Sequence, residues 1–120
     1  MAHAVVGADG SRGIVRRWLD ARENPPHVAR LLETVTPASG REPEYQDRFA
    51  RFDFTPTLDA LQGYYWDFPS LIGGIPFMNR GVYDGRVSAG KPRASLPRLL
   101  KEYAREHGAE PEDIELEGHP

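Results

Sequence analysis

A glycine-rich turn near the start of the chain is the first segment whose residues could do chemistry. Gly7-Ala8-Asp9-Gly10 follows an apolar run over residues 4–6, and residues 11–21 have the periodicity of an amphipathic helix. Glycines let the backbone approach a ligand closely, and a helix start directs free N–H groups at an anion. Asp9 could accept a hydrogen bond from a sugar hydroxyl, or it could simply cap the helix. The segment therefore fits a nucleotide site or an ordinary strand–turn–helix junction.

Alternating aromatic residues form the second candidate, in a strand predicted over residues 58–68. Tyr64, Trp66 and Phe68 occupy every second position, so their side chains should share one face of a sheet with Gln62. Such a face can pack on the protein's own core. It can also form the apolar wall of a ligand cavity, where tyrosine and tryptophan offer polar tips. Both interpretations stay open on this pattern alone.

The remaining reactive residue types do not gather into a catalytic or metal-binding pattern. The four histidines are scattered along the chain, and cysteine is absent. The nucleophile-elbow motif G-x-S-x-G is absent as well. An acidic run over residues 110–113 and the alternating charges of residues 98–106 are expected to be solvated. The sequence thus predicts neither a self-contained catalytic apparatus nor a metal.

Length and composition limit the class of protein. A chain of 120 residues with 39% hydrophobic and 28% charged residues is typical of one globular domain, and 12 glycines with 11 prolines predict much turn and loop. The net charge of -3 gives no electrostatic case for nucleic acid. No apolar run approaches the roughly 18 residues of a membrane span, and the N-terminus does not resemble a signal peptide. We therefore expect a soluble cytoplasmic protein.

The elements that would position these residues predict an α+β fold with an antiparallel sheet of about four strands. Strands are predicted over residues 28–37, 52–55, 58–68 and 75–83, with a last short strand over residues 114–116. Turns are predicted at Gly73-Gly74 and Asp84-Gly85, and Pro69 is expected to end its strand. A helix is expected between an N-cap at Ser95 and Gly108, and residues 38–47 are expected to form a surface loop.

Two segments resemble one family of flavoenzymes. VVGADGSRGIVRR, residues 5–17, resembles the second flavin-binding fingerprint, G-A-D-G-x-x-S-x-V-R, of FAD-dependent monooxygenases and geranylgeranyl reductases, with Gly13 in place of the serine. GYYWDFP, residues 63–69, is similar to the Y-x-W-x-F-P signature of the geranylgeranyl reductase branch. Asn79-Arg80-Gly81 is similar to that branch's Asn-Val-Gly, from which Arg80 departs.

The resemblance implies an FAD-dependent oxidoreductase of the para-hydroxybenzoate hydroxylase-like superfamily. Residues 1–26 would then be the end of a Rossmann-like FAD domain, and residues 27–120 would be an incomplete substrate domain. NAD(P)H would reduce the flavin, which would reduce an isoprenoid double bond or hydroxylate an apolar or aromatic substrate. The implied FAD contacts are Gly7, Ala8, Asp9, Gly10 and Arg16. The implied substrate cavity is lined by Gln62, Tyr64, Trp66, Phe68 and Asn79.

In this family the first fingerprint, G-x-G-x-x-G, would lie upstream, and a later Gly-Asp motif would lie downstream. We therefore expect the chain to be the middle of a larger flavoprotein that, on its own, lacks activity and does not hold FAD tightly. The alternative is a small non-enzymatic α+β binding module. An exposed face carrying Tyr64, Trp66 and Phe68 would then serve a partner or self-association.

Overall fold

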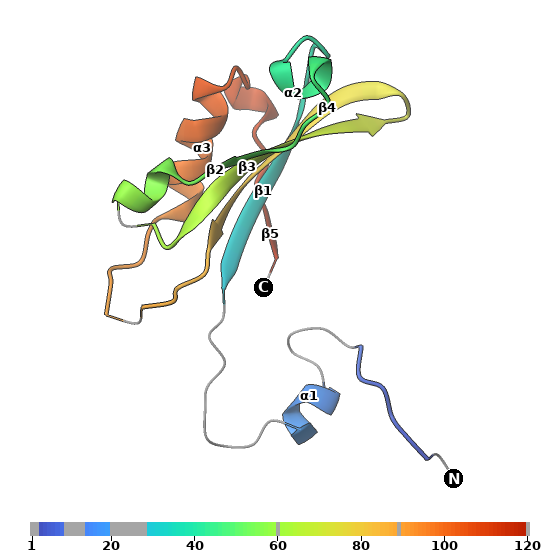
Figure 1. The fold of residues 1–120 in the computed structure, drawn as a ribbon, viewed down its shortest axis with the longest axis vertical. Helices are drawn as coiled ribbons and strands as arrows, with labels where there is room; N and C mark the ends of the chain where they lie inside the picture. The colour runs from blue at the N-terminus through green and yellow to red at the C-terminus, as the bar shows by residue number, and fades with distance from the viewer. Residues whose placement is uncertain (1–2, 9–13, 20–28, 60, 89, 120) are drawn as a thin grey trace.

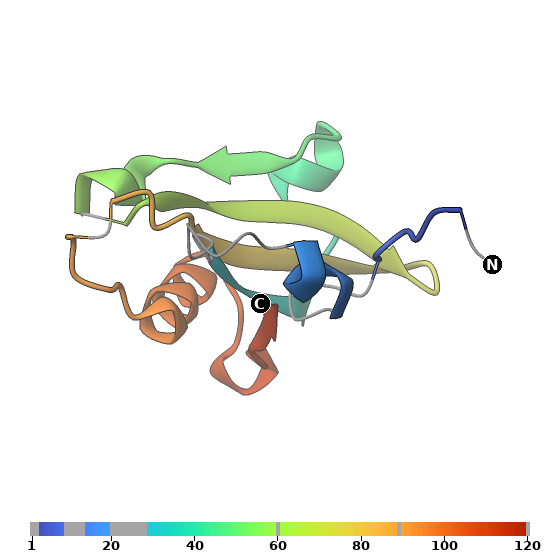
Figure 2. The same ribbon diagram turned by 90° about the horizontal axis from the view of Figure 1, so that it is seen from below.

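The computed structural model describes residues 3–8, 14–19, 29–59, 61–88 and 90–119, and its centre is a five-stranded antiparallel sheet (Figure 1). The strand order is β2-β3-β4-β1-β5. The strands are β1 (Arg30–Pro37), β2 (Arg51–Asp53), β3 (Gly63–Ile72), β4 (Ile75–Asp84) and β5 (Glu117–His119). Helix α3 (Leu96–Glu106) packs on one side of this sheet, as Figure 2 shows. The α+β class and the antiparallel sheet are confirmed, with five strands instead of about four.

Strands β3 and β4 form a long hairpin whose turn agrees with the prediction. The turn residues Gly73 and Gly74 have φ of +58° and +84°, the left-handed conformation that a tight hairpin turn requires. The prediction that Pro69 ends its strand was wrong, because β3 continues to Ile72. Strand β2 pairs only as far as Asp67, so Pro69 lies where β3 has one neighbouring strand, and proline is tolerated there.

Three further boundaries differ from the predictions. The described residues 58, 59, 61 and 62 are not strand, because the 3-10 helix η1 (Thr55–Asp59) turns the chain after Asp53 accepts hydrogen bonds from the Thr55 amide and hydroxyl at 2.8 and 2.7 Å. Helix α2 (Pro43–Gln46) interrupts the expected loop over residues 38–47. The last strand is β5 instead of residues 114–116, because the turn η2 (Pro111–Asp113) directs Ile114 into a hydrophobic cluster with Ala104.

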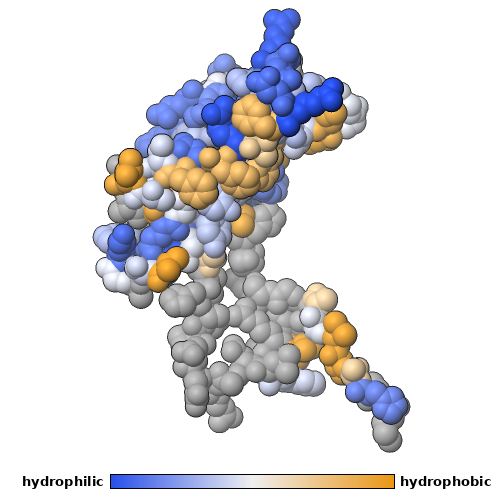
Figure 3. All heavy atoms as spheres, viewed as in Figure 1, coloured by the Kyte–Doolittle hydropathy of each residue, from blue (hydrophilic) through white to orange (hydrophobic). Residues whose placement is uncertain are grey.

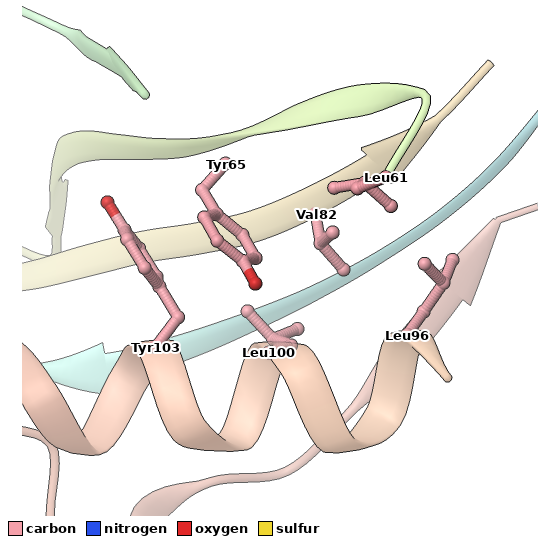
Figure 4. Close-up of a cluster of buried hydrophobic side chains, with 6 residues drawn as sticks. All are labelled: Leu61, Tyr65, Val82, Leu96, Leu100 and Tyr103. Atoms are coloured by element: carbon pink, nitrogen blue, oxygen red, sulfur yellow. The ribbon is translucent and has the colours of Figure 1, made fainter. Parts of the chain in front are cut away.

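Helix α3 buries its apolar stripe against the sheet, as its periodicity predicts. Ser95 is at the N-cap without a side-chain capping bond, and Gly108 has φ of +82° just beyond the C-terminus. Burying each large apolar side chain contributes about 1.5–3 kcal/mol. Figure 4 shows the main core cluster between helix and sheet, made of Leu61, Tyr65, Val82, Leu96, Leu100 and Tyr103.

The N-terminal part of the described chain contains the helix α1 (Ile14–Leu19), which Figure 1 draws apart from the sheet. Gly7 lies against this helix, since a Cβ on Gly7 would be 2.6 Å from the Val15 Cβ. The rest of the helix predicted over residues 11–21 lies outside the described residues. Within the described parts of the chain, no helix has the length and apolar character needed to cross a membrane.

Candidate functional site

Six aromatic side chains gather on the face of the sheet opposite α3, and we call this group the aromatic face. Each ring centroid lies 5.2 to 6.4 Å from a neighbouring one, mostly in edge-to-face or tilted geometry. The rings are those of Phe52, Phe54, Tyr64, Trp66, Phe68 and Tyr83. Strand alternation produces this arrangement, because Tyr65 and Val82 point into the core under α3 and their neighbours point the other way.

Trp66 lies at the centre of the aromatic face and is only 7% exposed. Gly81 is directly opposite on β4, and a Cβ there would lie 1.8 Å from the Trp66 Cζ2. The indole Nε1–H donates to Asn79 Oδ1 at 2.8 Å, and Asn79 Nδ2 donates to Glu33 Oε2 at 3.1 Å. The glycine therefore lets the indole lie on the backbone of β4, while Asn79 and Glu33 fix its polar edge.

The hairpin register brings together residues that are distant in sequence. Trp66 pairs with Gly81, and Phe68 pairs with Asn79. Four of the five predicted cavity residues thus meet on one face: Tyr64, Trp66, Phe68 and Asn79. The fifth, Gln62, lies before β3 and instead exchanges two hydrogen bonds with the backbone of Ser88.

Sequence reasoning missed five contributors to this face. Tyr83 and Gly81 could have been found by counting outward from the Gly73-Gly74 turn, since a two-residue turn sets the register of a hairpin. Phe52 and Phe54 carried no such signal, because β2 pairs with β3 only through the tertiary fold. Glu33, which holds Asn79, likewise arrives from the distant strand β1.

The aromatic face is open to solvent at its margin. Phe52 is 51% exposed and Phe54 is 56% exposed, and hydrophobic side chains are visible over the sheet in Figure 3. None of the six side chains is charged, while the two tyrosines carry hydroxyl groups. Such a surface can bind an apolar chain or a planar ring by burial and stacking.

The predicted cofactor segment is described only in part. Gly7 and Ala8 are exposed, and the backbone of Arg16 belongs to α1. Asp9 and Gly10 lie outside the described residues. Within the described ranges, histidines and carboxylates form no group of three or more that could hold a metal ion.

A buried polar network lies on the other side of the sheet. Arg80 Nε is 3.1 Å from Asp67 Oδ1, and Arg80 also donates to Thr36 Oγ1 and to the His107 carbonyl, each at 2.9 Å. The Tyr103 hydroxyl donates to Asp67 Oδ2 at 2.8 Å. Burial raises the pKa of the Asp67 carboxyl above its ordinary value, and the Tyr103 bond and the Arg80 charge act in the opposite direction.

This network explains why Arg80 does not disturb the aromatic face. Arg80 is 5% exposed and directs its guanidinium toward α3, away from Trp66 on the other side of β4. Arg80 therefore fastens the C-terminal end of α3 to the sheet. The residues on either side of Arg80, Asn79 and Gly81, keep their contacts with the indole.

Comparison of the chain with protein-family models, with curated proteins and with solved structures finds no match.

Proposed function

We propose that this chain is the sheet-bearing part of an FAD-dependent oxidoreductase of the geranylgeranyl reductase and flavoprotein monooxygenase type. The aromatic face is the wall of its cavity for an apolar substrate. One observation carries the proposal: the two segments that resemble this family around the hairpin are in contact. Trp66 of the first segment lies on Gly81 and donates to Asn79 of the second. The resemblance thus falls on residues that build one surface.

The residues of this chain would bind the substrate and exclude water from it. The rings of Phe52 and Phe68, with centroids 5.3 Å apart, offer partly exposed apolar surface beside the buried Trp66, and Tyr64 and Tyr83 add hydroxyl groups on the same surface. FAD, when bound, would supply hydride transfer, with NAD(P)H as the reductant. By the resemblance, Gly7, Ala8, Asp9, Gly10 and Arg16 contact the cofactor. The substrate would be an isoprenoid or an aromatic compound, and the proposal assigns no acid or base to this chain.

A second candidate is a non-enzymatic binding module, which the exposure of apolar residues favours. Phe52 and Phe54 are more than half exposed, and at the hairpin tip Leu71, Ile72 and Ile75 are 68%, 53% and 61% exposed. In that case the aromatic face would bind another protein surface or a second copy of the chain.

Trp66 itself can report on both candidates. Trp18 is 79% exposed, so a Trp18→Phe chain would emit from Trp66 alone. We expect lumiflavin, the ring portion of the cofactor, and geraniol each to change this emission saturably. Phe52→Ser, at the margin of the face, should weaken the binding of both probes by about threefold or more, because it removes an exposed aromatic ring that packs edge-to-face on Tyr64 and Phe68. Val87→Ser, at a 79% exposed position outside the six rings, is the matched control and should change neither.

The two candidate functions predict different results in these experiments. No saturable change up to the solubility limit of either probe would refute the cavity proposal. Sedimentation velocity then tests the module, for which a concentration-dependent dimer should be lost in Phe52→Ser and kept in Val87→Ser.

A further inference from the structure

A cleft of about 480 Å³ lies on the α3 side of the sheet, away from the aromatic face. One wall of the cleft is formed by η1 and the end of β2, and the other wall is formed by α3. Its volume is within the range of small-molecule sites. Tyr65 and Tyr103 line it as a stacked pair, with ring centroids 4.2 Å apart and planes 18° from parallel.

The charges around the cleft are mainly negative. Among the described residues, Asp53, Glu102 and Glu106 line it against Arg98 and His107. The Arg98 guanidinium is already engaged, since its Nη1 lies 3.1 and 3.0 Å from the two carboxylate oxygens of Glu102. Glu106 makes no hydrogen bond or ion pair with another described residue. A cation entering the cleft would therefore meet a carboxylate that no described cation neutralises.

The Tyr65 hydroxyl is a second, independent feature of this cleft. Tyr65 is 9% exposed, and its hydroxyl bonds to no described residue. Figure 4 shows the ring extending from β3 with its oxygen directed toward α3. Burial, followed by the charges of Glu102, Asp53 and Glu106, raises the pKa of Tyr65 to about 12. Because more than nine-tenths of Tyr65 is buried while its hydroxyl has no described partner, this oxygen is left to bind water or a ligand in the cleft that Tyr65 lines.

We propose that this cleft binds a small organic cation with an aliphatic body, such as an aliphatic amine. An ammonium group has three donors and no acceptor, which suits the Glu106 and Asp53 carboxylates together with the Tyr65 oxygen. The methylene groups would pack on the apolar part of the lining, where Leu61 and Leu99 lie. The cleft is separate from the aromatic face, so the proposed cation site does not depend on the oxidoreductase proposal.

The test is a titration of the full chain with hexane-1,6-diamine at pH 8, where an aliphatic amine of pKa about 10.4 is charged, followed by ¹H–¹⁵N NMR. Shifts should centre on Tyr65, Tyr103 and Glu106. Glu106→Gln should weaken binding about tenfold and Tyr65→Phe about threefold, which are typical for a charged and a neutral hydrogen bond. Glu112→Gln removes the same charge from an exposed position outside the lining and should weaken binding less than about twofold.

Three results would overturn the proposal. The first is equal weakening by Glu106→Gln and Glu112→Gln, which would mean diffuse attraction to an acidic protein. The second is equally strong binding of hexan-1-ol, which has the aliphatic body without the charge. The third is a shift pattern that avoids the cleft. Because Glu106 is exposed, its variant should fold normally and keeps the test decisive even if Tyr65→Phe does not fold.

Discussion

Replacing Gly81 with alanine should expel the Trp66 indole from its place on β4. The new Cβ would lie 1.8, 2.2 and 2.3 Å from the Trp66 atoms Cζ2, Cη2 and Cε2, all far inside van der Waals contact. The indole is rigid, and the rings of Tyr64 and Phe68 flank it with centroids 6.4 and 5.9 Å away. A small sideways shift therefore cannot relieve the clash, and the ring must leave.

The cost follows from the burial of this side chain. A tryptophan buries roughly 150–250 Å², worth about 4–6 kcal/mol at 25 cal/mol per Å². Trp66 is 7% exposed, so nearly all of that burial is at risk, together with about 1 kcal/mol for the bond to Asn79. Two effects reduce this loss. A displaced ring would still cover part of the open face, and alanine lowers the conformational entropy of the unfolded chain, which favours folding by about 0.5 kcal/mol. We expect a net loss of about 3 kcal/mol in the free energy of unfolding.

Urea denaturation of the Trp18→Phe chain, followed by Trp66 emission, measures this loss. With a slope of about 1–3 kcal/mol per molar, the midpoint should fall by roughly 1–3 M. The folded emission should shift to the red, because the displaced indole becomes hydrated. Gly90→Ala is the matched control, since a Cβ there meets nothing within 4 Å, and it should change the free energy of unfolding by less than about 0.5 kcal/mol.

Two results would refute the reasoning. One is a Gly81→Ala chain that loses less than about 0.5 kcal/mol and keeps its folded emission. The other comes from pairing Gly81→Ala with Trp66→Leu, which removes the large ring. If the alanine clashes with the indole, the double variant should show a coupling energy of about 1 kcal/mol or more, and additive effects would contradict the contact.

Three further predictions concern polar groups on the two faces of the sheet. Asn79→Leu should cost about 1–3 kcal/mol by leaving the Trp66 Nε1–H without its acceptor, and an unchanged exchange rate of the indole proton in NMR would contradict this. Arg80→Met should cost about 3 kcal/mol in urea denaturation, because the buried Asp67 carboxylate loses its nearer cation and keeps only Arg51, whose Nε lies 3.8 Å from Asp67 Oδ2. Adding Asp67→Asn should recover part of the loss, and no recovery would count against the pair. The free energy of unfolding should fall as pH rises from 10 to 12, and Tyr65 should contribute about 2 kcal/mol of this fall, because folding raises its pKa from 10.0 to about 12 and the unfolded chain releases its proton first. Burial and the Asp67 carboxylate also raise the pKa of Tyr103, which adds to the fall. Tyr65→Phe should make this part of the pH profile less steep by the Tyr65 contribution while the Tyr103 contribution stays, and an unchanged profile would contradict the assignment to Tyr65.

Much of the central hairpin could be predicted from local patterns. The alternation of Tyr64, Trp66 and Phe68 and the Gly73-Gly74 turn identify the strands, and together they set the pairing of Trp66 with Gly81. The stripe of leucines beginning at Leu96 identified α3 in the same way. Each of these signals depends on residues a few positions apart, so it predicts the local structure without any knowledge of tertiary contacts.

The failures share a different cause. The strand predicted from residue 58 begins at Gly63, because the Asp53 carboxylate binds Thr55 and starts a 3-10 turn that competes with extended backbone. A strand was predicted at β2, but over residues 52–55 instead of Arg51–Asp53, and β5 was predicted three residues too early. Each has three residues, too few for a periodic pattern, so its bounds depend on the strand with which it pairs.

The sequence by itself determined which side chains share a face, since strand alternation is a property of the backbone. It did not determine which face α3 would cover, because that choice depends on packing between segments more than 20 residues apart. Tertiary structure placed Tyr65 under the helix and left Trp66 on the open side, where Gly81 supplies the room for its indole. The same packing turned Arg80 toward Asp67 and formed the acidic cleft between η1 and α3. Both depend on contacts that no local pattern encodes.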